Sequence, residues 1–387
     1  MTADTSANAS TKRALLERTS TRISLTLLLL AAALWAFWPA PPAPTPPRSS
    51  GEPMKAIVYR EYGAADVLRL EQVDKPLPND NQVLIKVRAA SVNPLDWHYM
   101  HGKPYLMRID GSAFLKPKNS RLGSDVAGVV ETVGTNVTQF KPGDEVFGAG
   151  PGAFAEYVLA GQNRIALKPG NMSFEQAAAV PIAALTALQS LRDNGRLRPG
   201  QKVLINGASG GVGTFAVQIA KSLGAEVTGV CSTRNVDMVR ALGADHVIDY
   251  TGEDFTQSTE RYDVIIDNVS NHALSDITRV MKPDGRYVLI GGAGGPNDGK
   301  WLGPMIGAIK ALILSPFLSQ DVGMMLANIT TSDLLVLKEL MDSGKVTPVI
   351  DRTYTLSEVP AAIAYVEAGR ARGKVVIRLQ DEKAENE

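Results

Sequence analysis

Cysteine and histidine are scarce in this 387-residue chain, which contains one cysteine and four histidines. Because Cys231 is alone, no disulfide can form within the chain and a thiolate-rich metal site is excluded. His98 and His101 are three residues apart, but no third ligand nearby completes a zinc pattern. The 40 basic side chains balance the 40 acidic ones, and a neutral chain offers no electrostatic case for binding nucleic acid.

Long uncharged runs are also rare, and the clearest is Ile23–Trp38 near the N-terminus. Basic residues precede it and a proline-rich spacer follows. Its 16 residues would span roughly 24 Å as a helix, slightly less than the hydrocarbon core of a bilayer. We interpret residues 1–53 as an N-terminal extension with a candidate single-pass anchor at 23–38 and a proline-rich linker. This interpretation predicts a membrane location.

Two other interpretations of residues 1–53 stay open. The apolar run is short enough to be a cleaved secretory signal. Alternatively, translation starts at Met54, residues 1–53 are not part of the protein, and the protein is cytoplasmic.

The stretch Val203–Gly213 is the most informative part of the chain. An apolar, β-branched run predicts a buried strand over Lys202–Asn206, and a glycine-rich turn leads into a predicted helix over Val212–Leu223. Glycines leave backbone N–H groups open at the N-terminus of a helix, where the helix dipole attracts a pyrophosphate. A second strand, Val227–Cys231, follows after the usual crossover length. The pattern predicts a dinucleotide site formed by Ser209, Gly210, Gly211, Val212 and Gly213.

The remaining strand and helix patterns divide the chain into two regions. Up to Phe174, short strands separated by Gly and Pro turns are typical of a partly closed antiparallel β-barrel. Beyond it, strands and helices alternate, which predicts a doubly wound parallel sheet in an α/β domain. Strands at Val349–Tyr354 and Lys374–Arg378 then return to the first region. We predict a barrel domain over 54–177 and 346–380, and a nucleotide-binding domain over 178–345.

Four further motifs precede the glycine turn in a definite order: Ser91–Asp96, Gly123–Gly128, Gly143–Gly148 and Ala153–Tyr157. Together with that turn they resemble the medium-chain dehydrogenase/reductase superfamily, specifically its zinc-free quinone oxidoreductase branch. The resemblance covers about residues 54–379 and does not extend to the N-terminal extension. It implies a GroES-like catalytic domain joined to a Rossmann domain.

Departures from the zinc-dependent branch of this superfamily bear on the chemistry. That branch has a cysteine near the position of Asn93, and a His–Glu pair where this chain has Ser124 and Asp125. Without such ligands, alcohol oxidation through a Lewis acid is not open, and we predict no metal. Asp125 is instead expected to brace its turn by hydrogen bonds.

The predicted cofactor follows from the end of the second strand of the dinucleotide unit. An NAD site has Asp or Glu about 20 residues beyond the glycines, where it binds the ribose 2′-hydroxyl. This chain has Ser232, Thr233 and Arg234 there, and no acid. The Arg234 guanidinium suits a 2′-phosphate, with the two hydroxyls as further donors, so we predict NADPH. The alternative is an ordinary solvent-exposed arginine.

Other candidate site residues come from matching motifs of the family. The resemblance places Asn93 beside the nicotinamide, Thr186 with its hydroxyl toward the cofactor, and Tyr105 at the mouth of the active site. The alternatives are a turn amide before Pro94, a hydroxyl bonded back to its own helix, and a tyrosine that only stacks. We predict Asn93 and Tyr105 as catalytic residues.

Three loops complete the predicted cofactor site. Lys374 matches a family position near the cofactor, although a plain lysine on a strand edge explains it equally well. Parallel sheets bind ligands at the carboxyl ends of their strands, where Asn268, Gly291 and Gly292 follow two predicted strands.

An apolar segment over Trp301–Leu326 has three possible roles. It could form a pocket wall or lid over a bulky apolar substrate, a dimer core or ordinary packing, or a surface that dips into a membrane.

These expectations define an NADPH-dependent, zinc-independent oxidoreductase that reduces quinones or α,β-unsaturated carbonyls by hydride transfer. We expect a homodimer with a small-molecule acceptor. Two alternatives remain: a membrane-tethered NADPH-binding scaffold or sensor with low turnover, and an enoyl-thioester reductase.

Overall fold

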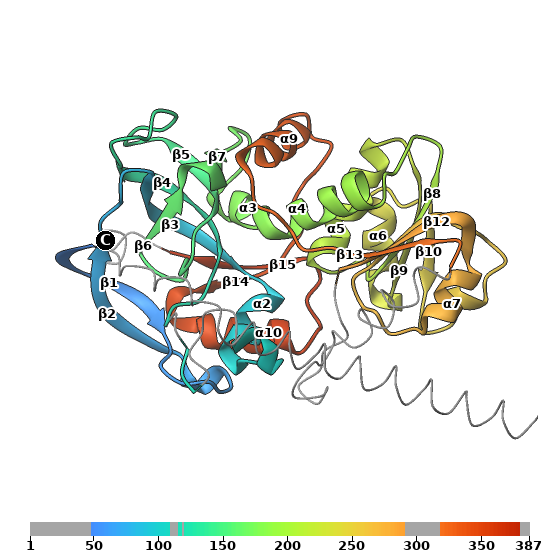
Figure 1. Cartoon of the computed structure of the whole chain (residues 1–387), viewed down its shortest axis with the longest axis horizontal. Coiled ribbons are helices and arrows are strands. Elements are labelled where there is room, and N and C mark those ends of the chain that lie inside the picture. Colours follow the sequence, from blue (N-terminus) through green and yellow to red (C-terminus); the bar gives the residue numbers. More distant parts are fainter. Residues whose placement is uncertain (1–47, 109–114, 118–119, 291–317, 380–387) are drawn as a thin grey trace, which may run out of the picture. The chain divides into compact units, whose positions relative to one another are not determined.

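The described strands of this protein form one antiparallel-rich sheet, one parallel sheet and a separate two-stranded ribbon (Figure 1). The structure is a computed structural model, and it describes residues 48–108, 115–117, 120–290 and 318–379. The apolar run at 23–38 therefore lies outside the described residues, as do Gly291, Gly292 and most of the segment 301–326.

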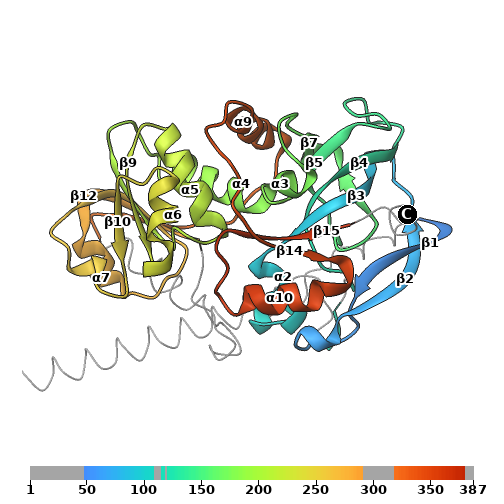
Figure 2. The same ribbon diagram turned by 180° about the vertical axis from the view of Figure 1, so that it is seen from behind.

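The first region is built on long antiparallel pairs (Figure 2). Its strands are β1 (Ser49–Val58) paired with β2 (Arg69–Pro76), and a sheet of β14 (Ile350–Thr355), β15 (Lys374–Arg378), β3 (Gln82–Val92), β4 (Asp125–Val133), β5 (Glu145–Ala149) and β7 (Ile165–Leu167), with β6 (Tyr157–Gly161) on β3. The hydrogen-bonded path from β14 to β7 does not return on itself, so the predicted barrel is open. The late strand β15 pairs with β3, as the return of the chain to the first region predicts.

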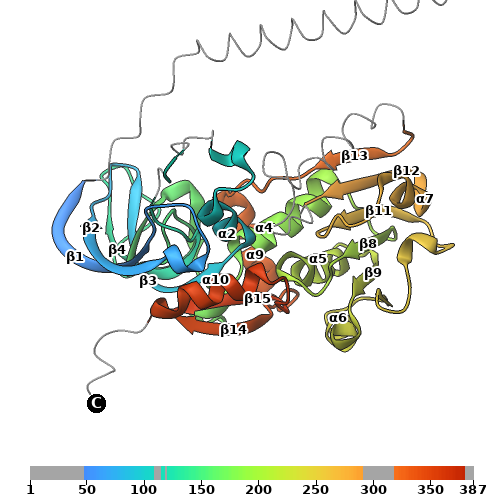
Figure 3. The same cartoon turned by 90° about the horizontal axis from the view of Figure 1, so that it is seen from below.

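The second region is a six-stranded, entirely parallel sheet (Figure 3). Its order is β10 (His246–Asp249), β9 (Glu226–Cys231), β8 (Lys202–Asn206), β11 (Tyr262–Asp267), β12 (Met281–Leu289) and β13 (Asp321–Met324). The doubly wound fold predicted from the sequence is confirmed. The domain boundaries stay a prediction.

Both faces of the parallel sheet are covered, and its central strand β8 carries apolar side chains on each face. Val203 and Ile205 of β8 pack in one core with α4, α5 and α9, whereas Leu204 joins a second core with α7 on the opposite face. This alternation follows from the two-residue period of a strand. The described helices are α2 (Pro94–His101), α3 (Phe174–Ala178), α4 (Pro181–Gln189), α5 (Gly211–Ser222), α6 (Val236–Ala241), α7 (Leu274–Arg279), α9 (Thr331–Asp342) and α10 (Val359–Glu367).

Several boundaries differ from the sequence-based expectation. The predicted helical stretch 174–194 consists of α3, α4 and a π turn at Ser190–Asn194. The break between α3 and α4 falls before Pro181. Proline begins α4 because the first residue of a helix needs no N–H partner. Within the expected apolar segment 301–326, residues Asp321–Met324 form the edge strand β13. The role of the segment stays a prediction.

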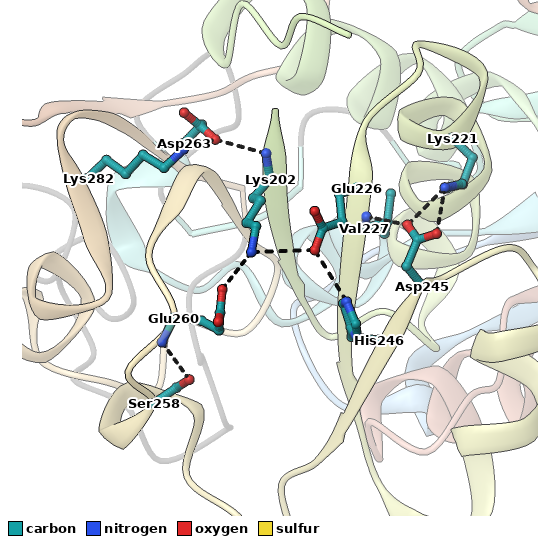
Figure 4. Close-up of polar contacts among 10 residues, drawn as sticks. All are labelled: Lys202, Lys221, Glu226, Val227, Asp245, His246, Ser258, Glu260, Asp263 and Lys282. Carbon is teal, nitrogen blue, oxygen red and sulfur yellow. Dashed lines mark hydrogen bonds and ion pairs between the residues drawn. The ribbon is translucent and has the colours of Figure 1, made fainter. Parts of the chain in front are cut away.

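Ion pairs gather at the amino ends of the parallel strands (Figure 4). Lys202 at the start of β8 lies 2.7 Å from Glu260 and 3.5 Å from Glu226, and Lys221 lies 2.8 Å from Asp245. Such exposed pairs contribute little to stability, because water and salt screen them. They lie at the end of the sheet opposite the carboxyl ends, where doubly wound sheets bind ligands, so we treat them as structural.

Candidate active site

The glycine turn joins β8 to the N-terminus of α5. Gly207 has φ +78°, a conformation that favours glycine, and the N–H of Gly210 donates to its carbonyl at 3.2 Å. Gly210 caps the helix without a side-chain hydrogen bond. No capping side chain therefore covers the N-terminus of the helix, which suits an anion, and the binding of a pyrophosphate there stays a prediction.

Gly213 of this turn has a packing role. A Cβ atom on Gly213 would lie 2.1 Å from the Gly207 carbonyl oxygen, whereas one on Gly210 would lie 3.5 Å from the same oxygen. We expect Gly213→Ala to lower the melting temperature strongly, since a backbone atom must move, and to abolish NADPH binding. Gly210→Ala is the matched control and should fold with near-native stability. Equal melting temperatures for the two variants would contradict this account.

A buried asparagine links the turn to the end of β9. The Asn235 amide nitrogen donates to the hydroxyls of Ser209 and Ser232 at 3.0 and 3.1 Å. Its amide oxygen is buried without a hydrogen-bond partner. Sequence reasoning selected the two serines and missed Asn235, although it directly follows Arg234. The Thr233 hydroxyl, predicted as a donor, lies 2.8 Å from that of Thr251.

Two arginines flank the end of β9. Arg234 is exposed and donates to the Arg370 carbonyl oxygen at 2.9 Å, while Arg372 approaches the Arg234 carbonyl oxygen at 3.5 Å. The Arg372 Nε atom is buried and has no partner. Neither guanidinium forms an ion pair with a carboxylate of the described residues. Two cations without ion-pair partners among the described side chains, each bonded to the other arginine's chain segment, suit a phosphate, and Arg372 is a second candidate that sequence reasoning missed.

The loop after β11 is fixed by the buried carboxylate of Asp267. Its Oδ1 atom accepts from the Asn206 side chain and from the N–H groups of Val269 and Ser270, and its Oδ2 atom accepts from the Tyr287 hydroxyl at 2.8 Å. Burial, and then the nearby carboxylate, raise the pKa of Tyr287, which therefore stays a donor.

Asn268, a predicted cofactor residue, is held by this loop. Its amide nitrogen donates to the Asn206 carbonyl oxygen at 2.9 Å, and its amide oxygen is buried without a partner.

The predicted residues Asn93 and Lys374 meet in a buried polar cluster below the turn. Lys374 is 3% exposed, which excludes the alternative of a plain edge lysine, and its Nζ atom lies 2.7 Å from Asn93 Oδ1. The Asn93 amide nitrogen donates to Asp125 at 2.8 Å, so its amide is engaged on both sides. This geometry favours bracing over donation to a substrate oxygen, and the catalytic role of Asn93 stays a prediction. Burial lowers the pKa of the Lys374 ammonium.

The buried carboxylate of Asp96 stabilises the loop that carries Asn93. The carboxylate accepts from the N–H groups of Asn93 and Gly123, at 2.8 and 3.0 Å. Burial nevertheless raises its pKa to about 7. Sequence reasoning quoted Asp96 only within a motif; its position three residues into α2 is the signal for this capping role.

Thr186 and Tyr105, two further predicted site residues, differ in the contacts of their side chains. The Thr186 hydroxyl donates back to the Ile182 carbonyl oxygen at 2.7 Å, which is the alternative considered for it from the sequence. Tyr105 is half-buried, and the Arg108 guanidinium lies 4.5 Å from its ring centroid and 4.1 Å from that of Tyr62. The catalytic role of Tyr105 also stays a prediction.

The site fits a dinucleotide. The open N-terminus of α5 suits a pyrophosphate, the arginine pair suits a 2′-phosphate, and the orphaned oxygens of Asn235 and Asn268 suit hydroxyl or amide donors. For metals, no three His, Cys, Asp or Glu side chains in the described ranges converge on a possible ion site. Fold and site together define a nicotinamide-dependent oxidoreductase.

Comparisons with known proteins support an oxidoreductase of this class. The family model described as the alcohol dehydrogenase GroES-like domain matches residues 79–170, and that described as zinc-binding dehydrogenase matches 242–377. Mitochondrial NAD(P)H oxidoreductase RTN4IP1 of Mus musculus is 37% identical, over 90% of this chain and 97% of its own. 2-methylene-furan-3-one reductase of Solanum lycopersicum is 36% identical, over 84% and 79%. The structure of the quinone oxidoreductase from Coxiella burnetii has a TM-score of 0.74 and 31% identity, over 85% and 100%.

The chain belongs to the medium-chain dehydrogenase/reductase superfamily and is an NADP-dependent oxidoreductase. The predictions of family, fold class and cofactor are confirmed. Its reaction partner is a small-molecule substrate.

The predicted membrane location is wrong. Within the ranges that the structure describes, no helix has both the length and the apolar character needed to cross a bilayer. Relatives are named as mitochondrial and chloroplastic enzymes. The length of the apolar run already argued against a membrane anchor, because 16 helical residues fall short of the roughly 20 needed to span the hydrocarbon core.

Proposed function

We propose that this protein reduces quinones or α,β-unsaturated carbonyls with NADPH, without zinc. The observation that carries the proposal is the junction of the two regions: Gly210 forms a β-bridge with Gly373, and the next residue, Lys374, reaches Asn93. The cofactor turn therefore lies one side chain away from the loop that the family places beside the nicotinamide. Relatives named for reduction of quinones and a furanone support this acceptor class.

Separate parts of the site contribute to this reaction. The reduced nicotinamide supplies the hydride when bound. Arg234 and Arg372 bind the 2′-phosphate, and the N–H groups at the start of α5 bind the pyrophosphate. Asn93 shapes the acceptor side of the nicotinamide pocket. Tyr105, or water, delivers the proton to the carbonyl or quinone oxygen.

Positioning supplies most of the rate acceleration in this proposal. The Asn93 amide, the Lys374 ammonium and the Asp125 carboxylate are all engaged with one another, so none of the three is poised as a free acid or nucleophile. Holding hydride donor and acceptor in contact can itself lower a barrier by about 7–11 kcal/mol.

The test follows NADPH absorbance with the full-length chain, a quinone, an enone and a long-chain enoyl thioester. We expect turnover with the quinone or the enone on the order of 10 s⁻¹, unchanged after dialysis against a chelator. Bound NADPH with no oxidation by either would contradict the proposal and favour the scaffold or sensor. Saturation by the thioester alone would favour the enoyl reductase, and stoichiometric zinc would contradict zinc independence.

The homodimer is also kept as a proposal. Light scattering on the purified chain tests it directly, and a monomeric mass would exclude it.

A further inference from the structure

A buried ion pair lies below the glycine turn, between Lys374 of β15 and Asp125 of β4. Lys374 is 3% exposed and Asp125 is fully buried. The Lys374 Nζ atom lies 2.7 Å from Asn93 Oδ1, 3.2 Å from the Val92 carbonyl oxygen and 3.4 Å from Asp125 Oδ2. Three acceptors match the three protons of an ammonium group, so the cation is fully satisfied by protein atoms.

Asp125 gathers partners from separate elements. Its Oδ2 atom accepts from the Ser91 hydroxyl and from the Asn93 amide, each at 2.8 Å. Its Oδ1 atom accepts from the N–H of Ile182, at the start of α4, at 3.0 Å. One carboxylate thus ties together the end of β3, the start of β4 and the first turn of α4.

Lys374 extends this cluster to the cofactor turn. The N–H of the preceding residue, Gly373, donates to the Ser209 carbonyl oxygen at 3.0 Å. A Cβ atom built on Gly211 would lie 3.2 Å from Lys374 Cδ, so the aliphatic part of the lysine lies directly beneath the turn. The same side chain therefore contacts the turn with its stem and the Asn93 loop with its ammonium.

Stability alone is a poor reason for this arrangement. Removing two charges from water is costly, and apolar residues of similar volume often stabilise a buried site as well as an ion pair does. Apolar side chains, however, would not fix the direction of the Asn93 amide or the register between the two loops, because their contacts are not directional.

We propose that Lys374 and Asp125 form a positioning pair, which fixes the cofactor turn against the Asn93 loop and so sets the approach of hydride donor to acceptor. This inference rests on the proposed function for its kinetic consequence. Its structural consequence, a rigid turn, can be measured without turnover. The pair touches neither cofactor nor substrate in this assignment, and both residues act through Asn93 and through the turn.

The experiment compares Lys374→Met with the double variant Lys374→Met/Asp125→Asn. The single variant leaves a buried carboxylate unpaired and should be strongly destabilised, whereas the double variant removes both charges and should recover most of the melting temperature. We expect amide hydrogen exchange over Asn206–Gly213 to be faster in the double variant than in the wild type, by about tenfold or more.

In the double variant, kcat with the accepted quinone or enone should fall on the order of 10²-fold, while the Kd for NADPH changes by less than about threefold. Lys202→Met is the matched control, because Lys202 is an ion-paired strand lysine at the amino end of β8, away from the turn (Figure 4). It should leave both the exchange of the turn and kcat unchanged.

Wild-type exchange over the turn in a stable double variant would overturn the inference, as would wild-type kcat. If the wild type itself shows no turnover, the proposed function fails, and the exchange measurement still decides the rigidity of the turn. The two failures are thus distinguishable.

Discussion

Replacing Arg234 or Arg372 by alanine is expected to weaken NADPH binding about 10- to 100-fold and to leave NADH binding nearly unchanged. A hydrogen bond to a charged group contributes about 1.5–3 kcal/mol, and each 1.4 kcal/mol is a factor of ten in Kd. The Arg234 and Arg372 segments are joined by bonds from the two guanidinium groups to the Arg370 and Arg234 carbonyl oxygens. Without an ion-pair partner among the described carboxylates, both are available to the 2′-phosphate, which NADH lacks.

Fluorescence titration with each cofactor measures this discrimination. Arg240→Ala is the matched control, since it removes one exposed positive charge from α6 whose partner is Asp237. It should leave the ratio of the two Kd values unchanged. An NADPH preference that survives loss of both Arg234 and Arg372 would contradict this assignment of the 2′-phosphate site.

Replacing Asp267 by alanine is expected to lower the free energy of unfolding by about 4 kcal/mol. The change leaves the Tyr287 hydroxyl and the N–H groups of Val269 and Ser270 without their acceptor, and each buried orphan costs about 1–3 kcal/mol. Ser270 has φ +57°, so its loop also loses the bond that supports an unfavourable backbone conformation. Because Asn268 follows directly, NADPH binding should weaken as well.

Urea unfolding of Asp267→Ala and Tyr287→Phe separates the parts of this network. Tyr287→Phe removes one hydrogen bond and should cost only about 1 kcal/mol. Asp276→Ala, which removes an exposed carboxylate paired with Arg279, should change the free energy of unfolding by less than about 1 kcal/mol. Equal losses for Asp267→Ala and Tyr287→Phe would show that the loop does not depend on the carboxylate.

Much of the cofactor site could be predicted because its signals are local. The apolar strand β8, the glycines from Gly207 to Gly213 and the amphipathic helix α5 are contiguous, and sterics allow few conformations for such a sequence. The absence of an acid after β9 was equally readable from spacing. These features led to the parallel sheet, the dinucleotide and NADPH.

The strand limits and the polar cluster could not be read in the same way. β13 is four residues long and lies near the end of a largely apolar segment, so periodicity gave no boundary for it. Thr186 matches a family position, yet its hydroxyl bonds to its own helix, a choice that depends on what surrounds α4. The motif suggested a role for Lys374, but nothing near it in the sequence indicated that its ammonium is buried.

The sequence by itself determined the class of enzyme, the two kinds of sheet and the turn that receives the cofactor, because short-range sterics and hydrogen bonding decide those features. Only the tertiary structure decided which side chains meet there. Lys374 and Asn93 are 281 residues apart, and Arg372 and Arg234 are 138 apart. Contacts over such separations depend on how the two sheets pack and on the antiparallel pairing of β15 with β3. No local pattern in the sequence encodes that geometry.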